Sequence, residues 1–298
     1  MENQLEYSRS EGRAMYSAQI TRANPTCLIL LLDQSGSMVD PFSGDASVRK
    51  AEYVADVVNH TLHDLVIRCT KTEEVRNYYY VSVIGYGGQV SSAFGGALSS
   101  YRIAPIAELA DYPLRVETRY KSVPDGMGGV VEMPFRFPVW VQPQAGGKTP
   151  MCEALKQAKG IIQSWVAEHP RGFPPTVLHL TDGESSDGDP YQIGQEIMAL
   201  GTDDGPTLLF NCHVSSQRSA KIEYPSSAAV LKDGFARTLF EISSPLPASF
   251  LAAAAQLGVR AEEGSRGFVF NADPSSVVQF YEIGTSLTGM TPYRWMDS

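Results

Sequence analysis

Residues 26–38, TCLILLLDQSGSM, join an apolar run to a short polar loop. Six apolar residues, 27–32, follow one another without interruption, which is typical of a strand covered on both faces of a sheet. The loop begins at Asp33 and also contains Ser35 and Ser37. This stretch therefore predicts a buried strand with oxygen-bearing side chains at its carboxyl end.

Helix and strand patterns alternate on either side of an interruption in the middle of the chain. Apolar residues at helical spacing over 48–70 separate the first strand from a β-rich segment at 78–86. The later pattern predicts helices over 151–169, 191–200, 250–257 and 275–287, and strands over 176–180, 207–214 and 267–270. The whole predicts an α/β fold, a doubly wound, mostly parallel open sheet with helices on both faces.

The alternation stops between about residues 91 and 145. Gly, Pro and short β-prone pieces at 115–118 and 135–141 predict a β-hairpin insertion there. We expect the core to fold without residues 91–143, because surface insertions are well tolerated. The expected organisation is a polar N-terminal segment (1–25), one domain (26–288) that contains the insertion (91–145), and a C-terminal tail (289–298).

Composition excludes several classes of protein. The 298 residues are 43% hydrophobic and 19% charged, as expected of a folded globule. Acidic residues outnumber basic ones by 33 to 24, a net charge of −9 that repels phosphate backbones, so we expect no nucleic-acid binding. No stretch approaches the roughly 20 apolar residues of a membrane span. Four scattered cysteines and a polar N-terminus without a secretion signal favour the cytoplasm.

Five oxygen-bearing residues fall in three loops that follow strands or precede a helix: Asp33, Ser35, Ser37, Thr149 and Asp182. Ligands of such sheets bind at the carboxyl ends of the strands, so we expect these loops to converge. The set contains no His or Cys. Carboxylates and hydroxyls suit a hard cation such as Mg²⁺, with Mn²⁺ or Ca²⁺ as other candidates.

These five positions resemble the metal-ion-dependent adhesion site of von Willebrand factor type A domains, in the expected order and on the expected elements. Met38 and the run 149–151 are similar to stand-alone bacterial cytosolic members of that family. The resemblance implies hydroxyl ligation by the two serines. It implies that Thr149 binds the ion directly or through water, and that Asp33 and Asp182 act mostly through hydrogen bonds and waters.

An ion held mainly by neutral oxygens keeps excess positive charge and attracts a further carboxylate. We therefore expect an interaction module, not an enzyme, whose Mg²⁺ bridges to an Asp or Glu of a partner protein. The alternative is a regulatory subunit that gates a partner ATPase, kinase or phosphatase in a bacterial stress-response or defence system. The expected rim of the site is Gln34, Lys148, Gly183 and His213.

Other motifs favour simpler interpretations. Gly147-Lys148-Thr149 ends like a phosphate-binding loop, but Gln142 stands where that motif needs its first glycine. No G-x-S-x-G nucleophile motif occurs.

Three further groups of side chains have a functional and a structural interpretation. His60 and His63 could share a metal, yet no third ligand is near in sequence. Cys152 lies in the first turn of a helix, where thiol pKa falls, but we expect it to be buried. The acidic group formed by Glu184, Asp187 and Asp189 could hold Ca²⁺, but we expect a solvated loop.

Overall fold

The computed structural model describes residues 15–42, 45–124, 129–216 and 220–286, and its centre is one eight-stranded sheet. The strands in spatial order are β15 (Ile222–Glu223), β16 (Phe268–Ala272), β14 (Leu208–Val214), β11 (Thr176–Thr181), β1 (Thr26–Asp33), β6 (Tyr79–Tyr86) and β7 (Val90–Ser92), with β8 (Ala104–Pro105) also paired to β6. Strands β16, β14, β11, β1 and β6 are parallel neighbours, and the edge strands are antiparallel. The predicted mostly parallel sheet is confirmed.

Residues 27–32 of β1 are all apolar because both faces of the strand are covered. Leu28, Leu30 and Leu32 pack into the core on one face of the sheet. Ile29 and Leu31 pack into the core on the other face. Side chains alternate across a strand, so the middle of a strand that is buried on both faces is apolar at every position.

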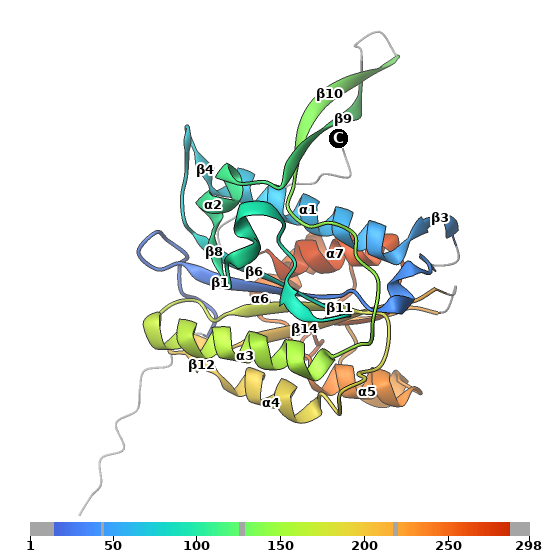
Figure 1. The fold of residues 1–298 in the computed structure, drawn as a ribbon. Coiled ribbons are helices and arrows are strands. Elements are labelled where there is room, and N and C mark those ends of the chain that lie inside the picture. Colours follow the sequence, from blue (N-terminus) through green and yellow to red (C-terminus); the bar gives the residue numbers. More distant parts are fainter. Residues whose placement is uncertain (1–14, 43–44, 125–128, 217–219, 287–298) are drawn as a thin grey trace, which may run out of the picture.

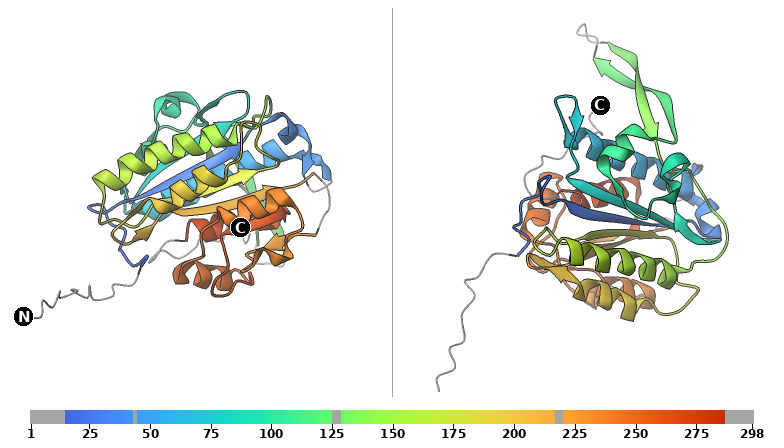
Figure 2. Two further views of the ribbon diagram at one scale, coloured as in Figure 1. Left: turned by 90° about the horizontal axis from the view of Figure 1, so that it is seen from below. Right: turned by 60° about the vertical axis from the view of Figure 1, so that its left-hand side comes forward.

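Helices cover both faces of the sheet, as Figures 1 and 2 show. The first face packs against α1 (Lys50–Cys69), α2 (Ile106–Asp111), α6 (Ala248–Gln256) and α7 (Pro274–Gly284). The second face packs against α3 (Met151–Glu168), α4 (Tyr191–Ala199) and α5 (Gly234–Glu241). The sequence did not predict α5. The last helix ends at Gly284, and the predicted tail lies outside the described residues.

The order of the parallel strands creates a switch point. From β1 the chain passes to β6 on one side and later to β11 on the other, so β1 and β11 are neighbours whose connections leave in opposite directions. Ligands of open α/β sheets bind in the crevice at such a point. Asp33 is the last residue of β1, and Asp182 directly follows β11.

The predicted insertion divides into a core part and a projecting part. The projecting part is an antiparallel hairpin of β9 (Arg115–Pro124) and β10 (Val130–Val139), which stands away from the sheet in Figures 1 and 2. We call it the arm. The rest belongs to the core, because Leu98, Ile106, Leu109 and Trp140 are at most 1% exposed. This burial argues against the expectation that the core folds without residues 91–143, because the deletion would remove these side chains, β8 and most of β7.

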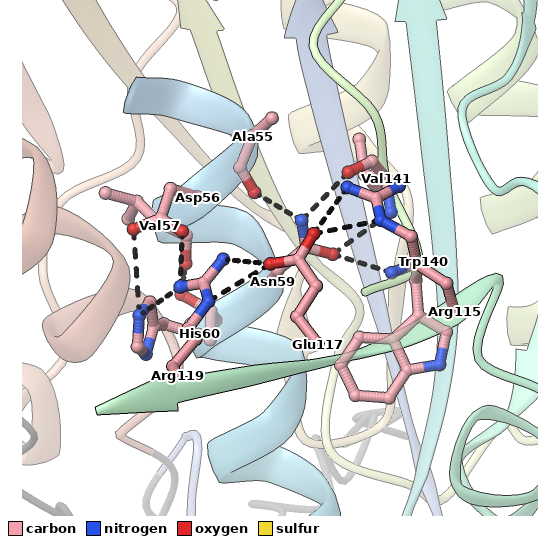
Figure 3. Close-up of polar contacts among 11 residues, drawn as sticks. Ala55, Asp56, Val57, Asn59, His60, Arg115, Glu117, Arg119, Trp140 and Val141 are labelled. Carbon is pink, nitrogen blue, oxygen red and sulfur yellow. Dashed lines mark hydrogen bonds and ion pairs between the residues drawn. The ribbon is translucent and has the colours of Figure 1, made fainter. Parts of the chain in front are cut away.

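The base of the arm is fixed to α1 through one buried amide (Figure 3). The Asn59 Oδ1 accepts hydrogen bonds from the Trp140 and Val141 amides at 2.8 and 3.0 Å. Its Nδ2 donates to the carbonyls of Val141 and Ala55, both at 2.8 Å. A helix side chain thus satisfies backbone groups that lie outside the sheet, which fixes where the arm leaves the domain.

A second, more exposed contact lies further along the arm (Figure 3). The Arg119 guanidinium pairs with Asp56 of α1 at 2.7 Å and with Glu117 at 3.1 Å. It also lies 3.7 Å from the centre of the Phe137 ring. The arm therefore meets α1 through both a buried and a solvated set of polar groups.

The N-terminal region is partly docked on the domain. The amides of Ser17 and Ala18 both donate to the Asp204 carboxylate at 3.0 Å. Residues 1–14 of the predicted polar segment lie outside the described residues. In the part of the chain that the structure describes, no helix combines the length and apolarity needed to cross a membrane.

Candidate functional site

Three loops lie side by side at the carboxyl edge of the sheet. The Gly36 amide donates to the Gly147 carbonyl at 3.1 Å, and the Gly146 amide donates to the Gln34 carbonyl at 2.8 Å. Gly147 has φ +80°, and a Cβ there would lie 2.5 Å from Gly88. Glycine at this position thus lets the loop before α3 lie against the turn between β6 and β7.

Asp33 forms the floor of the site and is 1% exposed. Its Oδ1 accepts a hydrogen bond from the Ser35 amide at 2.9 Å, and its Oδ2 accepts one from the Thr181 hydroxyl at 2.8 Å. Burial and the negative charge of Asp182 raise the pKa of Asp33 to about 6, against the opposing effect of these hydrogen bonds. A nearby cation would stabilise the ionised form.

The two serines and the second aspartate form a continuous chain of hydrogen bonds. The hydroxyls of Ser35 and Ser37 lie 3.1 Å apart. The Ser37 hydroxyl then donates to Asp182 Oδ1 at 2.8 Å. Ser35 is buried and Ser37 is exposed, so the chain leads from the floor of the site to its surface.

The remaining oxygen of Asp182 is occupied by a cation that sequence analysis did not single out. The Lys50 Nζ donates to Asp182 Oδ2 at 2.6 Å, and the two side chains are 3% and 0% exposed. Lys50 is the first residue of α1. A positive charge at that end of a helix is unfavourable unless a carboxylate offsets it, and this local anomaly could have identified Lys50 from the sequence.

Thr149 is held at the site through its backbone. Its amide donates to the Ser186 hydroxyl at 3.0 Å, and its carbonyl accepts from the Ser186 amide at 2.9 Å. This reciprocal pair joins the loop before α3 to the loop after β11. The predicted residues thus come from three loops that hydrogen bonds hold together.

The predicted rim residues differ in their surroundings. Gln34 lies beside a polar cavity of about 570 Å³ that Gln89 and Gln144 also line. Lys148 is exposed, and the Gly183 amide donates to the Thr181 hydroxyl at 3.3 Å.

His213 is more enclosed. Its ring stacks on Phe270 at 4.4 Å, and its Nδ1 accepts from the Asn271 amide at 3.3 Å. Burial lowers the pKa of His213 to about 4, and the positive charge of Lys50 contributes to the lowering. The imidazole is therefore neutral near pH 7 and lies close to both Lys50 and Asp182.

The donor set fits a hard divalent cation in its chemistry. Ser35 and Ser37 offer hydroxyl oxygens, with the carboxylates of Asp33 and Asp182 behind them. Within the described residues, no group of three or more His, Cys, Asp or Glu is arranged to hold a metal. A cation at this edge would therefore depend on hydroxyls as well as carboxylates, which suits Mg²⁺ or Mn²⁺ better than a softer metal.

The acidic residues after Asp182 have a structural role that the sequence interpretation missed. Asp187 accepts hydrogen bonds from the amides of Cys152 and Glu153 at 3.0 and 2.9 Å. These amides belong to the first turn of α3, where backbone donors have no partner within the helix. Glu184, Asp187 and Asp189 are all exposed, as expected of a solvated loop, and Asp187 in addition caps α3 from this loop.

The other side chains considered above take part in packing. Cys152 is 6% exposed, and burial raises the pKa of its thiol. The rings of His60 and His63 pack against Phe137 at 4.4 and 5.5 Å. Burial lowers the pKa of His60 to about 4. The contacts of the two histidines with Phe137 join α1 to the arm.

Several solved structures are similar to this chain. The manganese-loaded TRAP protein of Plasmodium vivax is 14% identical, with 90% of this chain and 76% of that chain covered and a TM-score of 0.39. The pilus adhesin RrgA of Streptococcus pneumoniae is 16% identical, with 57% of this chain and 22% of that chain covered and a TM-score of 0.30. The minor pilin PilB of Streptococcus sanguinis is 12% identical, with 54% of this chain and 30% of that chain covered and a TM-score of 0.29.

The chain thus spans less than a third of either streptococcal protein. No family model matches the chain, and no curated protein is similar to it in sequence. The assignment of the architecture rests on the strand order and the covered faces of the sheet.

Proposed function

We propose that this chain is a cation-dependent protein interaction module that docks an acidic residue of a partner at the edge of its sheet. One observation carries the proposal. The hydroxyls of Ser35 and Ser37 and the carboxylates of Asp33 and Asp182 are gathered at the switch point between β1 and β11. The resemblance of these positions to the adhesion site of von Willebrand factor type A domains points to the same role.

The residues of the chain have separate tasks in this proposal. Asp33 fixes the loop after β1 through the Ser35 amide and joins it to β11 through Thr181. Ser35, Ser37 and Thr149 offer oxygen ligands, and Asp182 orients the Ser37 hydroxyl. A bound Mg²⁺ or Mn²⁺ would supply an open coordination position that attracts a carboxylate. The polar cavity beside Gln34 offers amide groups to the partner's chain next to that carboxylate.

Capture of partners with and without free divalent cations tests the proposal. The immobilised chain is incubated with a lysate of its own cells in Mg²⁺, washed and eluted with EDTA, and the eluate is identified by mass spectrometry. We expect the same protein in each replicate. Ser37→Ala and Thr149→Ala should reduce its recovery about tenfold, because each removes an oxygen ligand.

Ser164→Ala is the matched control, because Ser164 is an exposed serine on α3. It should leave recovery unchanged. Replacing the partner's docking Asp or Glu should cost as much as EDTA, and combining both should add little, since each removes the same bond. Recovery that is equal in EDTA and Mg²⁺ contradicts the proposal. Turnover of a phosphate or ester substrate that Asp33→Ala abolishes would indicate an enzyme instead.

A further inference from the structure

The ion pair between Lys50 and Asp182 lies inside the candidate site. Asp182 presents one oxygen to the Ser37 hydroxyl and the other to the Lys50 ammonium. Both carboxylate oxygens of Asp182 therefore already accept a hydrogen bond, and one of the two donors, Lys50, is a cation. A divalent ion at the serine hydroxyls would approach a carboxylate whose charge Lys50 offsets.

The competition between the two cations is strong because the pair is shielded from water. With side chains 3% and 0% exposed, Lys50 and Asp182 lie in a medium of much lower effective dielectric than bulk solvent. Repulsion between an ammonium and a divalent ion is weakly screened there. The ammonium must therefore move away, or the ion binds more weakly.

The structure offers the ammonium a second carboxylate. Asp40 Oδ2 lies 4.0 Å from Lys50 Nζ, and the Asp40 side chain is 51% exposed. The backbone already joins the two residues, since the Lys50 amide donates to the Asp40 carbonyl at 3.0 Å. A rotation of the flexible lysine side chain would bring its ammonium from the interior carboxylate to the surface one.

We propose that Lys50 is a built-in cation that competes with the divalent ion for Asp182 and moves toward Asp40 when the ion binds. This inference rests on the proposed metal-dependent function and adds its regulation. Lys50 stabilises the metal-free site and sets the cation concentration at which docking begins. Partner docking then requires enough divalent cation to displace the ammonium.

Titration calorimetry with Mn²⁺ alone tests the competition. Lys50→Met removes the ammonium with little change in volume, and Lys50→Gln retains a hydrogen-bond donor in case the first variant fails to fold. Both should bind Mn²⁺ about tenfold more tightly than the wild type, a size typical of coupling between two binding events. Asp40→Asn should bind Mn²⁺ more weakly than the wild type, because the displaced ammonium loses its second carboxylate.

Lys71→Met is the matched control, since Lys71 is an exposed lysine on β4 (Thr70–Lys71), after the opposite end of α1 from Lys50. It should change the affinity for Mn²⁺ less than twofold, because its charge is screened. Circular dichroism establishes which variants are folded before they are titrated.

The outcomes separate this inference from the proposed function. Equal or weaker binding by both Lys50 variants, with wild-type binding abolished by Asp33→Ala, overturns the competition and leaves the proposed function standing. Binding by the Lys50 variants but not by the wild type supports the competition and contradicts a metal-dependent role of the wild-type chain. Absence of binding in every folded variant overturns both.

Discussion

Helix α1 takes part in two ion pairs of nearly equal length but very different burial. Lys50 meets Asp182 at 2.6 Å with side chains 3% and 0% exposed. Asp56 meets Arg119 of the arm at 2.7 Å with side chains 43% and 27% exposed. Breaking a buried pair leaves a charge without solvent, whereas partners of an exposed pair regain water. Distance alone therefore does not rank these contacts, and burial does.

The largest effect should follow from breaking the buried pair. In EDTA, Lys50→Met should lower the free energy of unfolding by about 3–5 kcal/mol, because it leaves the Asp182 carboxylate buried without its counter-ion. Urea denaturation followed by circular dichroism measures the change.

The double variant Lys50→Met with Asp182→Asn removes both charges and serves as the control. It should recover part of the stability lost in the single variant. A loss below about 1 kcal/mol for Lys50→Met would be typical of an exposed pair and would remove the contrast drawn here.

A somewhat smaller loss is expected at the buried base of the arm. Asn59→Ala deprives the Trp140 and Val141 backbones of their partners, and each unsatisfied buried group costs about 1–3 kcal/mol. We expect a loss of about 3 kcal/mol in urea denaturation.

Asn77→Ala provides the comparison, because the half-buried Asn77 accepts one hydrogen bond, from the Ala107 amide at 3.0 Å. It should cost about 1 kcal/mol. Equal losses in the two variants would mean that the arm does not depend on Asn59.

The exposed pair should contribute less. Arg119→Ala should cost about 1 kcal/mol, the sum expected of an exposed ion pair and a cation–π contact with Phe137. Salt separates the two pairs: in about 1 M NaCl the effect of Arg119→Ala should shrink, while that of Lys50→Met persists. Unfolding measured at low and high salt would refute this if both effects fell equally.

The smallest effects concern the histidines beside each pair. Burial lowers the pKa of both His213 and His60 to about 4, and the cation of the neighbouring pair adds to each shift. Because the folded pKa lies below the ordinary value near 6.5, each histidine makes the fold less stable as pH falls from about 6.5 to 4.

Replacing Lys50 or Arg119 by an uncharged residue should raise the pKa of the neighbouring histidine. Nuclear magnetic resonance titration should show a higher pKa for His213 in Lys50→Met and for His60 in Arg119→Ala, each with the other histidine unchanged. A shift of His60 in Lys50→Met would mean that the variant disturbs α1 as a whole.

Much of the fold was predictable because burial on both faces leaves a clear pattern. The apolar run of β1 and the helical spacing of α1 and α3 identify their elements within a few residues. The segment around Leu98 and Ile106 was misread as surface, because its short elements carry Gly and Pro and show no long periodicity. Its burial depends on pairing with β6, which joins parts of the chain that local patterns do not connect.

The convergence of Asp33 and Asp182 was predictable from the sequence, but the pairing of Asp182 with Lys50 was not. Asp33 and Asp182 directly follow or end strands that are neighbours, so strand order alone brings them together. Lys50 reaches Asp182 across 132 residues and from the start of a helix. No short motif contains such a contact. The one local sign of the contact is that Lys50 places a positive charge at the N-terminus of α1, where the helix dipole disfavours a cation.

A crystal structure of the chain grown in saturating Mn²⁺ tests the central claim most directly. Anomalous scattering locates Mn²⁺ without reference to its ligands. The account predicts a peak beside the hydroxyls of Ser35, Ser37 and Thr149, with the Lys50 ammonium displaced from the 2.6 Å contact that it makes with Asp182. A map with no peak at these loops, and with Lys50 still bonded to Asp182, would contradict it.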